Sequence, residues 1–126
     1  MEGPELKPVV WVGSSRGDLR EFPDPVQKKI GTALQQVQYG LRPLSAKPLS
    51  GFGNASVLEI RTDYDSDTYR AVYAVRFPDA VYVLHMFQKK SRQGIHTDKR
   101  DMDLVRDRLR AAEALSREAV DEGREG

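Results

Sequence analysis

The sequence predicts an α+β fold, in which a small, mostly antiparallel sheet is packed by an N-terminal helical hairpin and a C-terminal helix. The sheet is indicated by residues 68–90, where apolar and aromatic side chains alternate on both sides of a short turn at Pro78 and Asp79. The helices are indicated by apolar residues that recur at helical spacing in residues 26–37 and again in residues 102–112.

The N-terminal third predicts a strand followed by two helices. Residues 7–13 form a short apolar run that is typical of a strand. Two serines then offer a helix cap, so a short helix is expected over residues 14–22. A second helix is expected after the two prolines up to about Tyr39, and Gly40 stands where a helix commonly ends. Its apolar positions are Val26, Ile30, Ala33, Leu34 and Val37.

The middle of the chain predicts a loop and three sequential antiparallel strands. Residues 41–54 are rich in proline and glycine and are expected to form a loop. Residues 56–62 alternate weakly and read as a strand, and the Asp- and Ser-rich stretch 63–67 is expected to turn the chain into residues 68–90. Beyond these strands a third helix is expected to begin at Thr97. Its apolar stripe consists of Met102, Val105, Leu109 and Ala112.

Length and composition limit the class of protein. The 126 residues are expected to form one domain, 1–126, with a core over about 8–112 and a tail, 113–126, that frays. The absence of cysteine excludes a disulfide framework, a zinc-thiolate site and a cysteine nucleophile. No apolar run approaches the roughly 20 residues that span a bilayer, and no secretory signal pattern opens the chain, so a cytoplasmic protein is expected.

The net charge of +1 is unevenly distributed. Residues 40–100 hold ten Lys and Arg against six Asp and Glu, whereas residues 113–126 hold five acidic residues against two arginines. A basic middle keeps an anion-binding role open, but it does not indicate a strong non-specific nucleic-acid binder.

Arg70 lies in the middle of an aromatic and β-branched run, where a strand that only packs would not place an arginine. Two interpretations stay open: a solvated residue on an open sheet face, or a positioned phosphate ligand. The alternation of this strand places Tyr69, Ala71, Tyr73, Val75 and Phe77 on one face, and Arg70, Val72, Ala74 and Arg76 on the other.

Several segments occur in one order along residues 10–109: WVGSSRGDLREFP, a helix ending in Tyr-Gly, AKPLSGFG, VLEIRTD, YRAVYAV and VYVLHMFQKKS. This series resembles the phage-derived RelE/HigB-like toxin family of bacterial type II toxin–antitoxin systems. The resemblance implies a RelE/ParE-like sheet with the helical hairpin on one face. It also implies ribosome-dependent cleavage of mRNA, without metal or cofactor, that arrests translation and growth. The implied partners are the ribosome with its mRNA and a small helix-turn-helix antitoxin.

Cleavage of RNA through its own 2′-OH needs a group that takes the proton, cations that stabilise the phosphorane, and help for the leaving oxygen. Arginine suits the second task because its planar fork matches phosphate oxygens. By the resemblance, Arg70 corresponds to the family's mid-strand arginine and Arg61 to the basic residue of the preceding strand. We expect Arg70 to bind the scissile phosphate and Arg61 to support it; the alternative is two solvated arginines.

His85 has the chemistry of an acid/base group near neutral pH. Related toxins use a histidine or tyrosine at or just after the end of this strand. The alternation places His85 on one face with Val81, Val83, Phe87 and Lys89, so a hydrogen-bonded core histidine is the alternative. Phe87 either stacks on an RNA base or belongs to the core.

Basic residues gather around the end of the last predicted strand, where contacts to the RNA backbone are expected. They are Lys89, Lys90, Arg92 and Lys99. Lys47, in the predicted loop, is another candidate, and a solvated surface is the alternative for all of them. His96 stands where some relatives place a catalytic tyrosine, which makes it a further acid/base candidate.

Glu59, two residues before Arg61, departs from relatives that have a lysine-rich strand here. An acidic side chain beside a phosphate site repels RNA unless it pairs with an arginine or acts as the base. The sequence leaves both roles open.

Other functions remain as alternatives to the nuclease. A toxin-fold protein can bind a target such as DNA gyrase without cleaving RNA, as ParE-type proteins do. An inactive relic would only bind its antitoxin, and a small α+β domain of unrelated role would do neither. The combination of His85, Arg70 and the paired lysines favours the nuclease.

Overall fold

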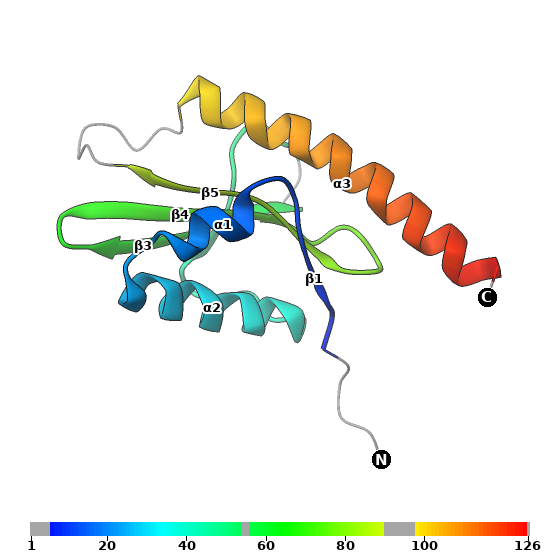
Figure 1. The fold of residues 1–126 in the computed structure, drawn as a ribbon, viewed down its shortest axis with the longest axis horizontal. Coiled ribbons are helices and arrows are strands. Elements are labelled where there is room, and N and C mark those ends of the chain that lie inside the picture. The colour runs from blue at the N-terminus through cyan, green and yellow to red at the C-terminus, as the bar shows by residue number, and fades with distance from the viewer. Residues whose placement is uncertain (1–5, 54–55, 90–97, 126) are drawn as a thin grey trace, which may run out of the picture.

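One mixed sheet lies between two helical layers, as Figure 1 shows. The structure is a computed structural model that describes residues 6–53, 56–89 and 98–125. Helices α1 (Ser15–Arg20) and α2 (Asp24–Gln38) cover one face, and α3 (Lys99–Glu125) crosses the other. The predicted α+β class is therefore confirmed.

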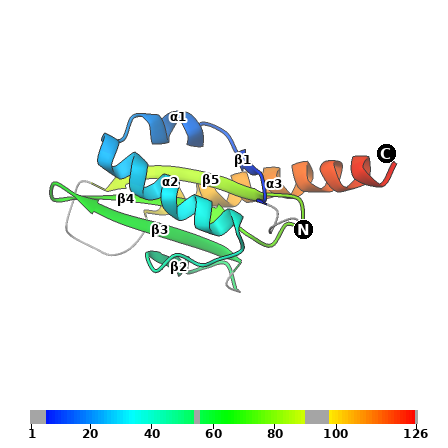
Figure 2. The ribbon, with the colours of Figure 1, turned by 90° about the horizontal axis from the view of Figure 1, so that it is seen from below.

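The sheet has five strands in the order β1-β5-β4-β3-β2. β1 runs parallel to β5, and the other neighbours are antiparallel. The strands are β1 (Val9–Trp11), β2 (Ala46–Pro48), β3 (Val57–Tyr64), β4 (Asp67–Ala74) and β5 (Val81–Lys89). The three sequential antiparallel strands are as expected, and Figure 2 shows β2 at the edge beside β3.

Strand β2 is the element that the sequence did not predict. It lies inside residues 41–54, which were expected to be a loop, and pairs with β3 through Ala46 and Ile60. A strand of three residues that ends in Pro48 is too short to show an alternation of apolar and polar side chains in the sequence. An edge strand tolerates this proline because its outer side needs no hydrogen-bond donor.

Helix α2 forms as its apolar spacing predicts, since its five apolar positions are buried against the sheet. The helix ends in a Schellman motif: the Gly40 N–H donates to the Val37 carbonyl, and the Leu41 N–H donates to the Gln36 carbonyl. Gly40 has a φ of +84°, which explains why glycine stands at this position. The turn between β3 and β4 is tighter than expected, because only Asp65 and Ser66, both with positive φ, separate the strands.

A β-bulge in β5 corrects the predicted strand face. Val72 pairs with His85 whereas Tyr73 pairs with Val83, so Leu84 is an extra residue on the β5 side. Val81 and Val83 therefore pack toward α2, and the expectation that they share a face with His85 is wrong. Alternation could not reveal the bulge because both faces of β5 are apolar. Phe77 likewise joins the α3 side rather than the face of Tyr69, because it lies beyond the end of β4.

Helix α3 extends to Glu125 and is 27 residues long, so the tail expected to fray is helical over residues 113–125. Polar contacts hold its C-terminal half where the apolar stripe fades. Asp79, in the turn between β4 and β5, accepts hydrogen bonds from the Ser116 and Tyr82 hydroxyls. Arg76 pairs with Glu113 beside them. None of the helices in the described ranges has the length and apolar character required to cross a bilayer.

Candidate active site

The strand register brings seven of the predicted site residues onto the sheet face that α3 crosses. One row across the sheet consists of Lys47, Glu59, Val72 and His85, and the next consists of Arg61, Arg70 and Phe87. Lys89 pairs with Thr68 in a further row, so the residues that share this face are Lys47, Glu59, Arg61, Arg70, His85, Phe87 and Lys89. Side chains from four strands therefore meet on one surface, although they are spread over residues 47–89 of the chain.

Arg70 is buried, with 1% of its surface exposed. Its Nη1 lies 3.4 Å from Oε2 of Glu59, the diagonal neighbour on β3. A buried guanidinium requires such a partner because the loss of hydration is otherwise too costly. The solvated alternative is thus wrong for Arg70. The two predicted arginines also differ in their exposure to solvent, because Arg61 is exposed and Arg70 lies beneath the surface.

Glu59 lies in a small pocket together with two exposed cations. The pocket has a volume of about 190 Å³ and is lined by Ser45, Lys47, Glu59, Arg61 and Asp63. The side chain of Glu59 is 14% exposed and lines the pocket, and its carboxylate contacts Arg70 underneath. The Asp63 carboxylate accepts a hydrogen bond of 2.9 Å from the Thr68 hydroxyl. The first role left open for Glu59, pairing with an arginine, is therefore confirmed, and the second remains compatible with this position.

Both ring nitrogens of His85 are engaged by α3. Nε2 lies 2.8 Å from Oδ1 of Asp101, and Nδ1 lies 3.4 Å from Nη1 of Arg108. Because a guanidinium only donates, Nδ1 is the acceptor and the Nε2–H donates to Asp101. The ring is 6% exposed and stacks on Phe87 with centroids 4.8 Å apart. The structure therefore shows the hydrogen-bonded core histidine, with half-buried Phe87 packed against it.

Arg108 joins α3 to both the sheet and α1. It donates to the Leu84 carbonyl at 2.9 Å and to the Ser14 hydroxyl at 3.0 Å, in addition to its contact with His85. Its path runs over Gly13, where a Cβ atom would lie only 2.7 Å from the arginine Nε. Sequence reasoning missed Asp101, Arg108 and this glycine, because no local spacing links them to a histidine in another element.

The remaining predicted contacts lie partly outside the described residues. Lys89 is half-buried at the end of β5, and Lys99 is exposed in the first turn of α3. Lys90, Arg92 and His96 lie outside the ranges that the structure describes. Within those ranges, no group of three histidine, aspartate or glutamate side chains is placed to hold a metal ion.

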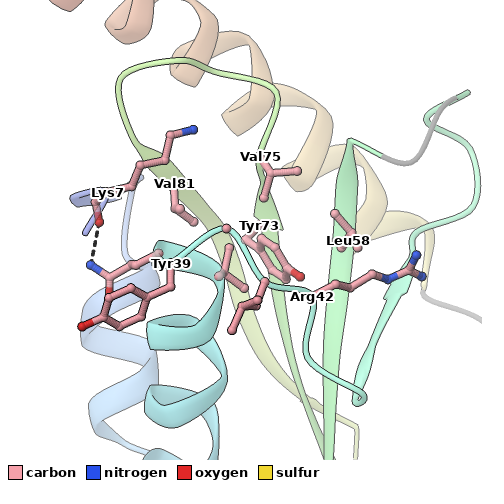
Figure 3. Close-up of a pocket in the computed structure, with 11 residues that line it drawn as sticks. Lys7, Tyr39, Arg42, Leu58, Tyr73, Val75 and Val81 are labelled. Carbon is pink, nitrogen blue, oxygen red and sulfur yellow. Dashed lines mark hydrogen bonds between the residues drawn. The ribbon is translucent and has the colours of Figure 1, made fainter. Parts of the chain in front are cut away.

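A larger pocket on the opposite face has a mainly apolar lining and holds none of the predicted site residues. Figure 3 shows Val75, Val81, Leu58 and Tyr73 around this hollow, with Arg42 beside it. Its volume is about 470 Å³. Burial raises the pKa of Tyr73 to about 12, which the charge of Arg42 counteracts only in part. A phenol with that pKa stays protonated at neutral pH.

A family model described as phage-derived protein Gp49-like matches residues 17–110. The chain belongs to this family. It is a type II toxin family of the RelE/HigB-like superfamily, so the resemblance read from the motif series is confirmed at that level. No curated protein matches the chain. The matched span of this Gp49-like chain contains both rows of the site, together with Asp101 and Arg108.

Proposed function

We propose that this Gp49-like chain is the toxin of a toxin–antitoxin pair, and that it cleaves mRNA on the ribosome through the RNA 2′-OH. One observation carries the proposal: Glu59 lines a pocket together with the exposed cations Lys47 and Arg61. A carboxylate takes protons and cations stabilise a phosphorane, so the pocket combines two of the three requirements of the reaction.

In the proposed reaction, Glu59 takes the proton of the 2′-OH and the resulting oxygen attacks the adjacent phosphorus. The bond from phosphorus to the 5′-oxygen breaks, and the Lys47 ammonium supplies the proton that this oxygen needs. The products are a 2′,3′-cyclic phosphate and a 5′-OH end. Arg61 binds the non-bridging oxygens with its fork, so the exposed arginine takes the role that the sequence assigned to Arg70.

Arg70 acts through Glu59 in this proposal. Its buried guanidinium holds the carboxylate from below and orients it toward the pocket. His85 has no free ring nitrogen in the described contacts, because Asp101 and Arg108 occupy both. We therefore assign His85 to holding α3 on the sheet rather than to proton transfer. The role of Phe87 is to support the histidine ring.

Membership of the family supports the proposed setting. The toxin acts in the cytoplasm, where it meets translating ribosomes, and a helix-turn-helix antitoxin encoded beside it keeps it inactive. No cofactor is required, because the proposed pocket supplies the acid/base and electrostatic groups from the chain itself. Lys99, exposed at the start of α3, is available for the RNA backbone on the same side of the sheet.

The test is induction of the chain in a bacterial host, with primer extension on a reporter mRNA. The wild type is compared with Glu59→Gln and with Arg110→Gln, which changes an exposed cation on α3. We expect new cuts within the translated region for the wild type and the Arg110 variant, and none for Glu59→Gln. Growth arrest with intact mRNA would overturn the nuclease in favour of a target such as gyrase. An absence of arrest and of cuts would leave two explanations, an inactive relic or a host that lacks the right target.

A further inference from the structure

A second hollow adjoins the site pocket. It lies between α2, residues 43–45 just before β2, and residues 61–63 of β3. It has a volume of about 680 Å³ and is called here the α2 groove. Ser45, Arg61 and Asp63 line both the α2 groove and the site pocket. The two hollows therefore meet at the edge of the sheet formed by β2 and β3. Figure 2 shows this edge of the sheet and α2.

Eight of the eleven residues that line the α2 groove are polar, and their charge is mainly positive. Lys28, Thr32 and Gln36 stand four residues apart and form a polar stripe along α2, with Lys29 beside the first of them. Both lysines are exposed and, within the described residues, neither makes an ion pair. Asp63 is the acidic residue of the groove, and its carboxylate is bonded to Thr68.

We propose that the α2 groove binds the sugar-phosphate backbone of the RNA strand whose cleavage occurs in the site pocket. This proposal rests on the proposed function, because it takes its ligand from that site. A single RNA strand carries one charge per nucleotide, so the nucleotides next to the scissile phosphate need cations along a continuous path. Lys28, Lys29 and Arg61 supply that path from α2 to the pocket.

The lining of the groove favours a backbone over a base or an apolar protein segment. Lysine is a flexible point charge that meets phosphate without reading sequence, whereas hydroxyl and amide groups such as Thr32 and Gln36 hydrogen-bond to sugar and phosphate oxygens. Aromatic residues, which stack bases, do not line the groove. Binding through this groove is therefore expected to be salt-dependent and tolerant of sequence.

The test is the affinity of the purified chain for a fluorescently labelled 2′-O-methyl oligouridylate, measured by anisotropy over a salt series. The methyl group blocks cleavage, so binding is measured independently of the reaction. The variant is Lys28→Gln/Lys29→Gln, and its matched control is Arg110→Gln/Arg117→Gln, which removes two exposed cations from α3. The loss of two phosphate contacts on a single strand should reduce the slope of log affinity against log salt by about 1.4.

We expect the lysine variant to bind several-fold more weakly, with that reduced slope, while the control matches the wild type. Equal affinity and slope for the wild type and the lysine variant would overturn the proposal that the groove binds RNA. An equal loss of affinity in the control variant would also overturn it. Displacement of the RNA analogue by polyglutamate at the same charge concentration would also overturn it, since it would identify a site for acidic protein segments. Failure of the proposed function looks different: binding would persist while ribosome-bound mRNA stays intact.

Discussion

Glu59 and Arg70 face each other diagonally across β3 and β4, with Arg70 Nη1 3.4 Å from Glu59 Oε2. The arginine side chain is 2% exposed and the glutamate 14%, so the pair has one member in the core and one at the surface. This arrangement gives the acid of the candidate site a fixed position. It also makes the arginine essential to the fold, whatever its part in catalysis.

Replacing Arg70 should therefore destabilise the protein strongly. Arg70→Met leaves the Glu59 carboxylate half-buried without its partner, and breaking a buried pair typically costs about 3–5 kcal/mol. Urea unfolding measures the change in free energy. The double variant Arg70→Met/Glu59→Gln removes both charges and should recover part of the loss. A cost below about 1 kcal/mol for the single variant, the range of an exposed pair, would contradict the buried pairing.

Gly13 should not tolerate a side chain. Its φ of +58° disfavours an L residue, and a Cβ atom would lie 2.7 Å from Arg108 Nε, so Gly13→Ala should lower stability by about 1–3 kcal/mol. The matched control is Gly31→Ala inside α2, where a Cβ atom meets nothing within 4 Å and the helix should gain up to about 1 kcal/mol. Equal melting temperatures for the two variants would show that Arg108 does not pass over Gly13.

His85 should matter more for stability than for cleavage. His85→Ala deletes the bonds to Asp101 and Arg108 and should lower the free energy of unfolding by about 1–3 kcal/mol. The cleavage rate per folded molecule should stay near that of the wild type. The comparison uses denaturant curves and mRNA cleavage on the same preparations. A His85→Ala protein that folds but does not cleave mRNA would contradict this prediction and support proton transfer by His85.

The turn between β4 and β5 should give α3 an acid-sensitive attachment. Burial alone would raise the pKa of Asp79, but hydrogen bonds from Ser116 and Tyr82 outweigh it, so the pKa is lowered below its usual 3.8. Because the pKa of Asp79 is lower in the folded than in the unfolded chain, its ionised carboxylate stabilises the fold at pH values above the unfolded pKa. This contribution is lost as the pH falls below about 4. Ser116→Ala should therefore reduce the loss of stability on acidification and speed amide exchange near residue 116. An unchanged acid dependence would contradict the attachment.

Much of the fold could be predicted from sequence because its signals are local. The helical spacing of α2 and the glycine that ends it specify that helix, and alternation specifies β4. The bulge in β5 and the edge strand β2 were missed because they depend on partners in other strands. The C-terminal half of α3 was missed because Ser116 is held by Asp79, a contact between distant positions.

The sequence predicted which residues form the candidate site but not how deeply each side chain is buried. Strand alternation and family resemblance identified Glu59, Arg61 and Arg70, and the register places them together. Both arginines were expected to reach the phosphate, but Arg70 is buried and only Arg61 is exposed to solvent. Alternation assigns a residue to a face but does not say whether a helix or neighbouring side chains cover it. The engagement of His85 by α3 was hidden for the same reason.

The central claim is that Glu59 takes the 2′-OH proton, and a reconstituted translation reaction with a defined mRNA tests it most directly. The purified wild type, Glu59→Gln and the control Arg110→Gln are compared by single-turnover cleavage of ribosome-bound mRNA. The wild type and the control should release fragments with 2′,3′-cyclic phosphate and 5′-OH ends, and Glu59→Gln should cleave about 10²–10⁴-fold more slowly. Cleavage by folded Glu59→Gln at the wild-type rate would contradict the claim.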